Sequence, residues 1–204
     1  MPDAATPSPH TPGGATDSPS IRDILDFWFL PLDHPEHGKL REDVWWKAPP
    51  EVDAEIGQRF GAALDRAITG ALDHWRRSPD GALALIILCD QFSRHMYRRT
   101  ARAFCGDPKA RETARYALAR GYPAVFDASM RGFFFLPFGH SEVLADQELA
   151  CSLYGAYRED LKHAIEHRDI VVRFGRFPHR NEVLGRISTE EELDYLKTAN
   201  RFGQ

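Results

Sequence analysis

Apolar side chains along the chain recur every three or four residues, which is the spacing of amphipathic helices. Ser20 is a good N-cap for a first helix, whose apolar stripe covers residues 21–28 and stops at Pro31. A longer stripe covers residues 52–72. No region shows the sustained two-residue alternation that is typical of a half-buried strand. The pattern therefore predicts an all-α fold in which short connections join antiparallel helix pairs.

The most apolar segment, residues 82–92, leaves little polar surface and is predicted to be the central helix. Ser78 and Pro79 precede it, and proline is tolerated in the first turn of a helix. The segment leads into Asp90 and Arg94, an acid and an arginine four residues apart. At the end of a buried helix, two such groups either satisfy each other or face a cleft.

Two further helix starts are predicted from capping residues. Asp107, which is followed by proline, is expected to cap a helix that ends at Gly121. Ser188 and Glu191 have the spacing of a capping box and are expected to begin the last helix.

Aromatic residues gather in two places. Trp45 and Trp46 fall in residues 41–47, which have the spacing of a short helix, and the two rings either close the core or line a pocket. A second group is expected to be core, or else to wall an apolar pocket beside polar residues together with the tryptophans. Its members are Phe133, Phe134, Phe135 and Phe138.

The densest chemistry lies in residues 163–192. A helical stripe covers residues 164–174, and Gly175 and Pro178 predict that this helix ends in a sharp, ordered corner. Two acids, Asp169 and Glu182, oppose five arginines there, so the corner suits either an anion or carboxylates from elsewhere in the fold. The arginines are Arg168, Arg173, Arg176, Arg180 and Arg186.

Length and composition limit the class of protein. A chain of 204 residues with 43% hydrophobic content can bury one sizeable core, so we predict a single helical domain over residues 20–204. Residues 1–19 are rich in Pro, Ser, Thr and Gly, lack the features of a secretory signal, and are predicted to be a disordered tail. A net charge of −4 argues against a nucleic-acid partner. No apolar run approaches the roughly 18 residues of a membrane helix, so we expect a cytoplasmic protein.

Three segments carry a family resemblance. They read ILCDQFSR (residues 87–94), LPFGHSEVLADQE (136–148) and HRDIVVRFGRFPHRNEVLGRISTEEE (167–192), and they resemble the bacterial family catalogued as domain of unknown function 924. The resemblance covers about residues 21–204 and implies a helical fold similar to tetratricopeptide repeats, without a settled activity. The chain departs from the family pattern at residues 93–96, where it has Ser-Arg-His-Met in place of Pro-Arg-Asn-Ile or similar. It has no internal repeat of ~34 residues, so the implied likeness to those repeats is architectural.

Polar residues in and beside these three segments form the candidate site, and we expect the segments to meet in space. The histidines would transfer protons near neutral pH, a carboxylate would orient an imidazole, and the arginines would hold a carboxylate or phosphate. The candidate catalytic residues are His140, His167, His179, Asp169 and Glu142. The candidate ligand-binding residues are Asp90, Arg94, Asp146, Arg173, Arg176, Arg180 and Asn181. Alternatively, these groups tie helix ends together in a buried polar network.

Metal binding is an alternative use of the histidines. His163 and His167 are four residues apart on a helix, and His140 with Glu142 or His179 could complete a shell. The chain lacks HExxH and paired CxxC spacings, so no metal ligands are assigned and the cofactor stays unknown.

Two classes of function remain open. The leading hypothesis is a protein that binds a small anionic or polar ligand in a cleft, and that acts on it as an acid–base enzyme or only binds it. The cleft would be lined by Arg94, His140, His167, Asp169, His179 and Arg180. The alternative is a tetratricopeptide-like adaptor for a peptide or protein partner, in which Arg180 pairs with a buried carboxylate such as Asp146 or Asp169. An enzyme needs the cluster in a concave pocket, whereas an adaptor needs an exposed groove elsewhere.

Overall fold

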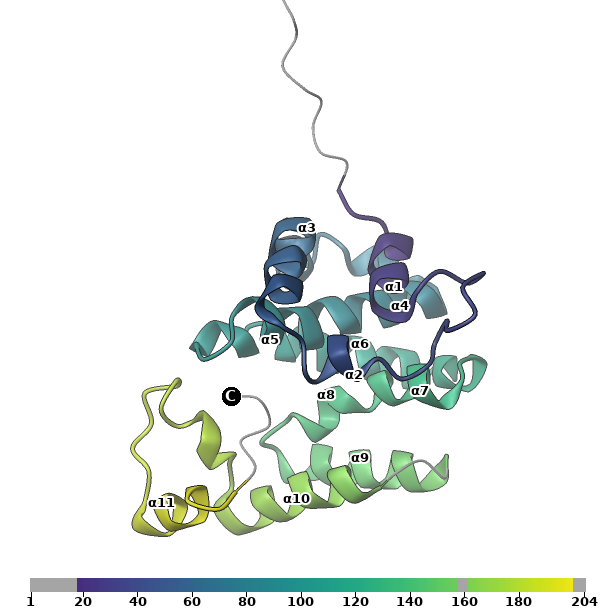
Figure 1. Cartoon of the computed structure of the whole chain (residues 1–204). Coiled ribbons are helices and arrows are strands. Elements are labelled where there is room, and N and C mark those ends of the chain that lie inside the picture. The colour runs from purple at the N-terminus through teal and green to yellow at the C-terminus, as the bar shows by residue number, and fades with distance from the viewer. Residues whose placement is uncertain (1–17, 158–160, 200–204) are drawn as a thin grey trace, which may run out of the picture.

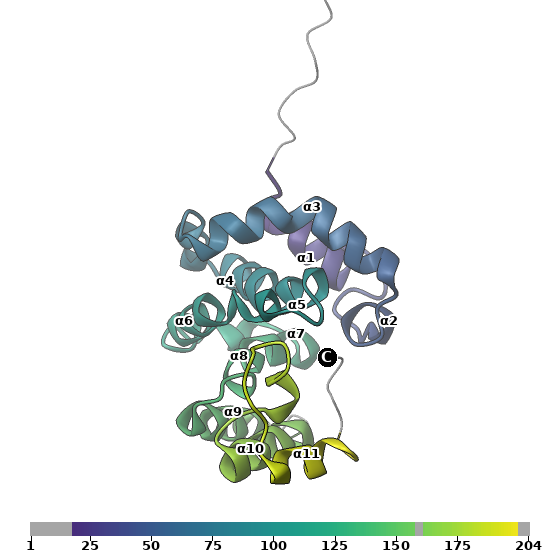
Figure 2. The same ribbon diagram turned by 90° about the vertical axis from the view of Figure 1, so that its left-hand side faces the viewer.

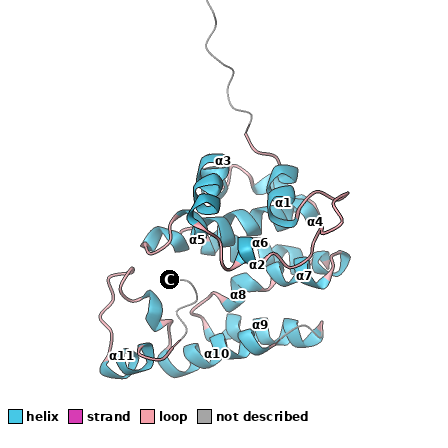
Figure 3. Cartoon of the chain, viewed as in Figure 1, coloured by secondary structure: helices cyan, strands magenta, loops and turns pink. Residues whose placement is uncertain are grey.

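The computed structural model describes residues 18–157 and 161–199, and within those ranges every regular element is a helix (Figures 1 and 3). The predicted all-α fold is confirmed. The tetratricopeptide-like arrangement and the limits of the single domain stay predictions. Residues 1–17, which make up most of the predicted tail, lie outside the described residues.

The first helix begins where its sequence predicts. In α1 (Ile21–Phe29) the Ser20 hydroxyl accepts the backbone N–H of Asp23 at 3.2 Å, and the Asp23 carboxylate accepts the Ser20 N–H at 2.8 Å. The short helix α2 (Glu42–Trp45) lies inside residues 41–47, as predicted. α3 (Pro50–Ile68) ends earlier than its apolar stripe, and Gly70 follows with a left-handed φ of 84°. Leu72 is buried beyond the end of the helix.

The central segment is helical and buried, but it is not one uniform α-helix. It runs through α4 (Pro79–Ile86), the π-helical η2 (Ile87–Phe92) and α5 (Ser93–Met96). The Ser78 hydroxyl caps α4 by accepting the Gly81 N–H at 3.1 Å. Short π-helical segments are rare and are frequently found at functional sites.

α6 (Asp107–Leu118) corrects one prediction. Asp107 is the first residue of the helix and makes no cap, because its carboxylate binds Arg94 instead. The N-cap position belongs to Gly106. After α6 the chain turns at Gly121, whose φ of 70° is left-handed, as expected for a helix stop.

The aromatic-rich stretch forms α7 (Ala128–Arg131), η5 (Gly132–Phe134) and α8 (Leu136–Gly139), and its four phenylalanines are buried. Next, α9 (Leu144–Ala156) and α10 (Lys162–Phe174) pack against each other. The remaining helical elements are the 3-10 turns η1 (Asp73–Arg77), η3 (Ala101–Phe104), η4 (Tyr122–Val125) and η6 (Pro178–Arg180), and α11 (Glu190–Leu196).

The capping box of α11 lies one residue later than predicted. The Thr189 hydroxyl accepts the Glu192 N–H at 3.2 Å, and the Glu192 carboxylate accepts the Thr189 N–H at 2.8 Å. Ser188 does not cap the helix, because its hydroxyl accepts a hydrogen bond from Asn181 at 3.0 Å.

The helices stack in layers. α1 and α3 form one outer layer, α4 to α6 lie beneath them, α7 and α8 follow, and α9 to α11 form the opposite outer layer (Figures 1 and 2). The main hydrophobic core extends from α1 to α9, and a smaller cluster of Ile170, Val171 and Phe177 holds the corner after α10. The polar corner is thus fixed against the last layer by its own apolar contacts.

Among the described residues, no helix combines the length and the apolar character that crossing a bilayer requires. The cytoplasmic location stays a prediction.

Candidate functional site

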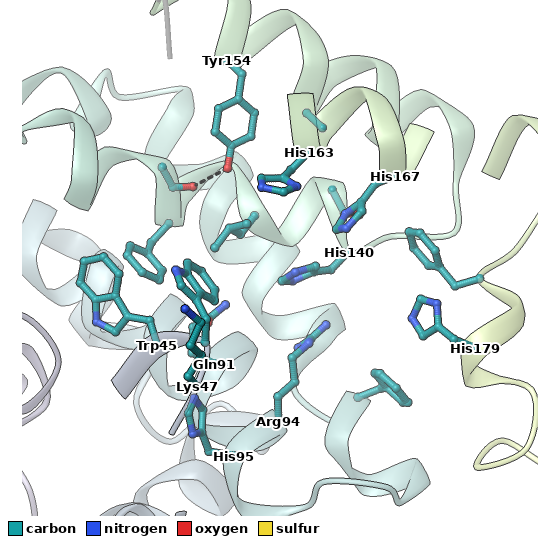
Figure 4. Close-up of a pocket in the computed structure, with 18 of the residues that line it drawn as sticks. Trp45, Lys47, Gln91, Arg94, His95, His140, Tyr154, His163, His167 and His179 are labelled. Atoms are coloured by element: carbon teal, nitrogen blue, oxygen red, sulfur yellow. Dashed lines mark hydrogen bonds between the residues drawn. The ribbon is translucent and has the colours of Figure 1, made fainter. Parts of the chain in front are cut away.

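A cavity of about 830 Å³ lies between the layers. Residues of α2, the η2–α5 segment, η5, α8, α10 and the corner around η6 line it (Figure 4). None of the described residues that line the cavity is an aspartate or glutamate, whereas four of them carry a cationic side chain. These four are Lys47, Arg94, Arg98 and Arg180.

The three sequence segments meet at this cavity, as expected. The first contributes Arg94 from α5, the second His140 at the end of α8, and the third His167 from α10 with His179 and Arg180 from the corner. Figure 4 shows His140, His167, His179 and Arg94 gathered around one part of the cavity.

His140 is oriented by a buried carboxylate. Its Nδ1 lies 2.9 Å and 3.0 Å from the two oxygens of Asp90. Because an ionised carboxylate only accepts hydrogen bonds, Nδ1 is the donor, and Nε2 is left for the cavity. Burial opposes the ionisation of Asp90, but the Arg94 charge and the His140 contact outweigh it and hold the pKa of Asp90 well below its ordinary value. Asp90 therefore stands behind the cavity as an anion and does not line it.

Arg94 forms ion pairs with two aspartates, Asp90 and Asp107. Its guanidinium donates to both oxygens of Asp107, at 2.9 Å and 3.2 Å, and to the backbone carbonyl of Asp90 at 2.5 Å. It also lies 3.3 Å from the Asp90 carboxylate. The two alternatives left open for Asp90 and Arg94 thus both apply, since the pair is satisfied and Arg94 lines the cavity.

Gly106 makes the contact between Asp107 and Arg94 feasible. A Cβ at this position would lie 2.1 Å from the backbone oxygen of Cys89, so only glycine allows the start of α6 to approach η2 this closely. The close approach brings Asp107 against the buried end of the central segment.

Arg180 is buried without a close anionic partner. Its side chain lies between the rings of Phe104 and Phe177, with Cζ 4.6 Å and 4.5 Å from their centroids. The nearest carboxylate oxygen, Oδ2 of Asp107, is 4.0 Å from Nη1 and already accepts from Arg94. Its Nε has no hydrogen-bond partner in the described part of the chain. Burial, reinforced by the Arg94 charge, lowers the pKa of Arg180 to about 10, so it stays cationic at neutral pH.

The two histidines from the third segment are neutral at pH 7. Burial, followed by the neighbouring His140, lowers the pKa of His167 to about 3, and burial with the adjacent Arg180 lowers the pKa of His179 to about 3. The Nδ1 of His167 donates to the Gly139 carbonyl at 3.0 Å. A pKa this low does not suit the proton transfer near neutral pH that the sequence suggested for these two residues.

Four of the five corner arginines are paired with carboxylates, so most of the predicted excess of positive charge is neutralised within the protein. The closest contacts join Arg168 to Asp169 (2.6 Å), Arg173 to Glu191 (2.8 Å), Arg176 to Glu192 (2.6 Å) and Arg186 to Glu142 (2.7 Å). Arg180 is the exception among the five.

Several candidate residues lie outside the cavity. Asp169 is exposed at 60% of its side chain and bound to its neighbour Arg168, so it does not orient an imidazole. Asp146 pairs with Arg115 and Arg111, and neither Asp146 nor Asp169 is the partner of Arg180. Four further candidates outside the cavity hold the corner together: Glu142, Arg173, Arg176 and Asn181.

Sequence reasoning missed Asp107, Lys47 and Gln91. An aspartate before a proline predicts a helix cap, and nothing local marks Asp107 as the partner of an arginine thirteen residues earlier. Lys47 and Gln91 adjoin Trp46 and Asp90 in sequence, and their places in the cavity lining depend on packing between layers.

No three His, Cys, Asp or Glu side chains of the described residues come together in an arrangement that could hold a metal ion. The rings of His140 and His167 lie 6.0 Å apart between centroids. A cofactor for the site stays unknown.

Fold and site together define a helical protein with a cavity rich in hydrogen-bond donors and in aromatic side chains. The chain belongs to the family of bacterial proteins of unknown function DUF924, whose model matches residues 24–200, so the family resemblance is confirmed. A similar solved structure is that of the protein of unknown function ATU0120 from Agrobacterium tumefaciens, which is 40% identical. The match covers 88% of this chain and 97% of that one, with a TM-score of 0.79. No curated protein matches the chain.

Proposed function

We propose that the cavity binds a small organic anion whose carboxylate or phosphate group is held by Arg180. The observation that carries the proposal is the state of this guanidinium, which is buried at 7% exposure and lies 4.0 Å from a carboxylate already bound to Arg94. A buried donor without a partner costs roughly 1–3 kcal/mol, and a charged one costs more. A bound anion would supply the missing acceptors.

The lining supports the same ligand chemistry. The guanidinium fork matches the two oxygens of a carboxylate or phosphate, and no carboxylate among the described lining residues would repel an anion. The carboxylates of Asp90 and Asp107 lie behind His140 and Arg94, which bind them. Lys47 and Arg98 also line the cavity, but each is already paired with a carboxylate outside the lining, Glu42 and Asp53 respectively.

Acid–base chemistry on the bound anion is the second candidate, and the Asp90–His140 pair favours it. The carboxylate fixes the ring of His140 and leaves Nε2 as the atom that would give or take a proton. The test is a screen of carboxylate and phosphate esters for turnover. We expect a hit to lose its turnover in His140→Gln while that variant still binds phosphate. Equal turnover in both proteins would exclude His140 from the chemistry.

The adaptor remains the alternative proposal. Exposed apolar side chains such as Val172, Ile187 and Leu193 are present on the α10 to α11 part of the chain. Scattered exposed apolar residues are ordinary on protein surfaces, whereas the polar cluster lies at a cavity, which favours the small ligand.

Arg180→Gln tests the proposed function, with Arg173→Gln as a matched control. Both changes remove one positive charge from the same corner, but Arg173 is exposed and paired with Glu191 outside the cavity. In wild type and in Arg173→Gln, inorganic phosphate or succinate should raise the melting temperature to the same extent. In Arg180→Gln the affinity should fall by roughly tenfold to a hundredfold, because a hydrogen bond to a charged group contributes about 1.5–3 kcal/mol.

The same variant separates binding from a structural role. Asp107 keeps its hydrogen bonds from Arg94, so Arg180→Gln should leave the free energy of unfolding without ligand nearly unchanged. A loss of about 3–5 kcal/mol, together with no response of the wild type to either anion, would contradict the proposal and favour the adaptor.

A further inference from the structure

We infer that the ligand is amphipathic, with its anionic group on Arg180 and an aromatic or aliphatic body against the Trp46–Phe133 wall of the same cavity. This inference rests on the proposed function and names the class of ligand. It comes from a part of the lining that anion binding alone does not use.

The Trp46–Phe133 wall presents carbon surface to the cavity. The ring of Trp46 lies parallel to that of Phe133, with an interplanar angle of 9° and centroids 6.3 Å apart. Trp45 also lines the cavity, but its Nε1 donates to the Trp28 carbonyl at 3.0 Å. The Tyr154 hydroxyl donates to the Gly132 carbonyl at 3.3 Å. The polar side-chain atoms of Trp45 and Tyr154 are therefore engaged within the protein, and the rings of Trp46 and Phe133 remain for an apolar group.

The Phe133 half of the wall is held in place before a ligand arrives. The ring of Phe133 makes edge contacts with Trp28, Phe29 and Trp45 at centroid distances of 5.9, 5.4 and 5.0 Å, and its side chain is buried. An apolar body that settles on this surface would not have to order it first, and this saves the entropy cost that weakens binding to flexible walls.

Two large apolar side chains of the lining remain open to solvent. Trp46 is 50% exposed and Leu40 is 61% exposed. One exposed apolar residue needs no explanation, but these two line the same cavity as the buried guanidinium. A ligand that covers them would remove apolar surface from water while its charged end reaches Arg180.

The size of the cavity also favours a ligand that is larger than an inorganic anion. A volume of about 830 Å³ lies within the range of small-molecule sites, about 300–1,000 Å³. A water molecule takes about 30 Å³ of liquid volume, and a phosphate ion of a few heavy atoms would leave most of the cavity unfilled. The ligand therefore has a body much larger than its anionic group.

Isothermal titration with three matched probes tests the inference: inorganic phosphate, phenyl phosphate and phenol. Phenyl phosphate should bind roughly tenfold to a hundredfold more tightly than inorganic phosphate, because it also buries a ring. Phenol, which lacks the anion, should bind more weakly than phenyl phosphate. Trp46→Ala should reduce the affinity for phenyl phosphate and leave that for inorganic phosphate unchanged, while Trp46→Phe should restore most of the loss.

Two controls keep the result specific. Leu32→Ala removes another exposed apolar side chain that does not line the cavity, and its affinities should equal those of the wild type. Arg180→Gln should weaken the binding of both phosphates.

The failures can be told apart. If inorganic phosphate binds through Arg180 but phenyl phosphate binds no better and Trp46→Ala has no effect, the amphipathic ligand is excluded and the proposed function stands. If phenol binds as tightly as phenyl phosphate and Arg180→Gln changes neither, an amphipathic anion is excluded together with the role of Arg180. If no probe binds, both proposals fall.

Discussion

Arg176 and Arg180 stand four residues apart in one corner, yet their surroundings are opposite. Arg176 donates to both oxygens of Glu192, at 2.6 Å and 2.8 Å, and so ties the corner to the last helix. Arg180 is buried beside two aromatic rings, and its Nε donates no hydrogen bond within the described part of the chain. The same residue type is therefore paired with a carboxylate at one position and left without a close acceptor at the other.

His167 yields a prediction about pH. Its pKa is about 3 in the folded protein and near 6.5 when exposed, so the unfolded chain takes up the proton first as the pH falls. The free energy of unfolding should therefore decrease as the pH drops below about 6.5, by up to about 1.4 kcal/mol per pH unit for this residue. His167→Gln should remove that share, and urea unfolding between pH 6.5 and 4 would measure it.

His163→Gln is the matched control for this experiment. It removes an imidazole from the same helix, but one whose side chain is 71% exposed, and its pH dependence should parallel that of the wild type. A parallel dependence for His167→Gln as well would show that the buried ring does not penalise protonation.

At the scale of elements, the close approach of α6 to η2 through Gly106 positions Asp107 against Arg94. Gly106→Ala would place a Cβ 2.1 Å from the Cys89 carbonyl oxygen, and the backbone would have to shift. We expect the free energy of unfolding to fall by about 1–3 kcal/mol or more, as measured by urea unfolding.

Gly155→Ala provides the contrast. Gly155 is an exposed residue in α9 with no atom within 4 Å of its Cβ position, so alanine there should be neutral or stabilising by up to about 1 kcal/mol. If Gly106→Ala and Gly155→Ala were equally stable, the α6 backbone could move away from η2 at little cost, and the contact would not fix the position of Asp107.

Most of the helices could be predicted from the sequence, because apolar spacing and capping residues are local features. Ser20 and Gly175 were read correctly for this reason. The π-helical turn at η2 escaped prediction, because a fully buried segment has no polar face to reveal a change of period. The last capping box was predicted one residue too early, because Ser188 and Thr189 both have a glutamate three residues later and their spacing does not distinguish them. Asn181, seven residues before Ser188, donates a hydrogen bond to the Ser188 hydroxyl, which leaves Thr189 to cap the helix.

The candidate site was predictable as a set of segments, and less so as a set of contacts. The sequence predicted that His140, Arg94 and Arg180 belong to one site, and all three line the same cavity. It could not assign their partners, because Asp90 lies 50 residues from His140, and the carboxylate that binds Arg176 lies on another helix. Asp169 illustrates the difficulty, because it lies in the richest segment and faces solvent.

At the scale of the whole molecule, the cavity exists only where several layers meet. Its lining comes from α2 near one outer layer, from the central segment, and from α10 and the corner in the opposite layer (Figures 1 and 4). The cationic end and the aromatic wall are therefore contributed by distant parts of the chain. A ligand that spans both would join the layers and should stabilise the fold as a whole.

A crystal soaked in selenate tests the central claim most directly, because the anomalous signal of selenium locates the anion. The account predicts a peak inside the cavity, within hydrogen-bond distance, about 3 Å, of the Arg180 guanidinium, and no cavity peak in Arg180→Gln. Peaks only at exposed arginines such as Arg173, with the cavity empty at a saturating concentration, would contradict it.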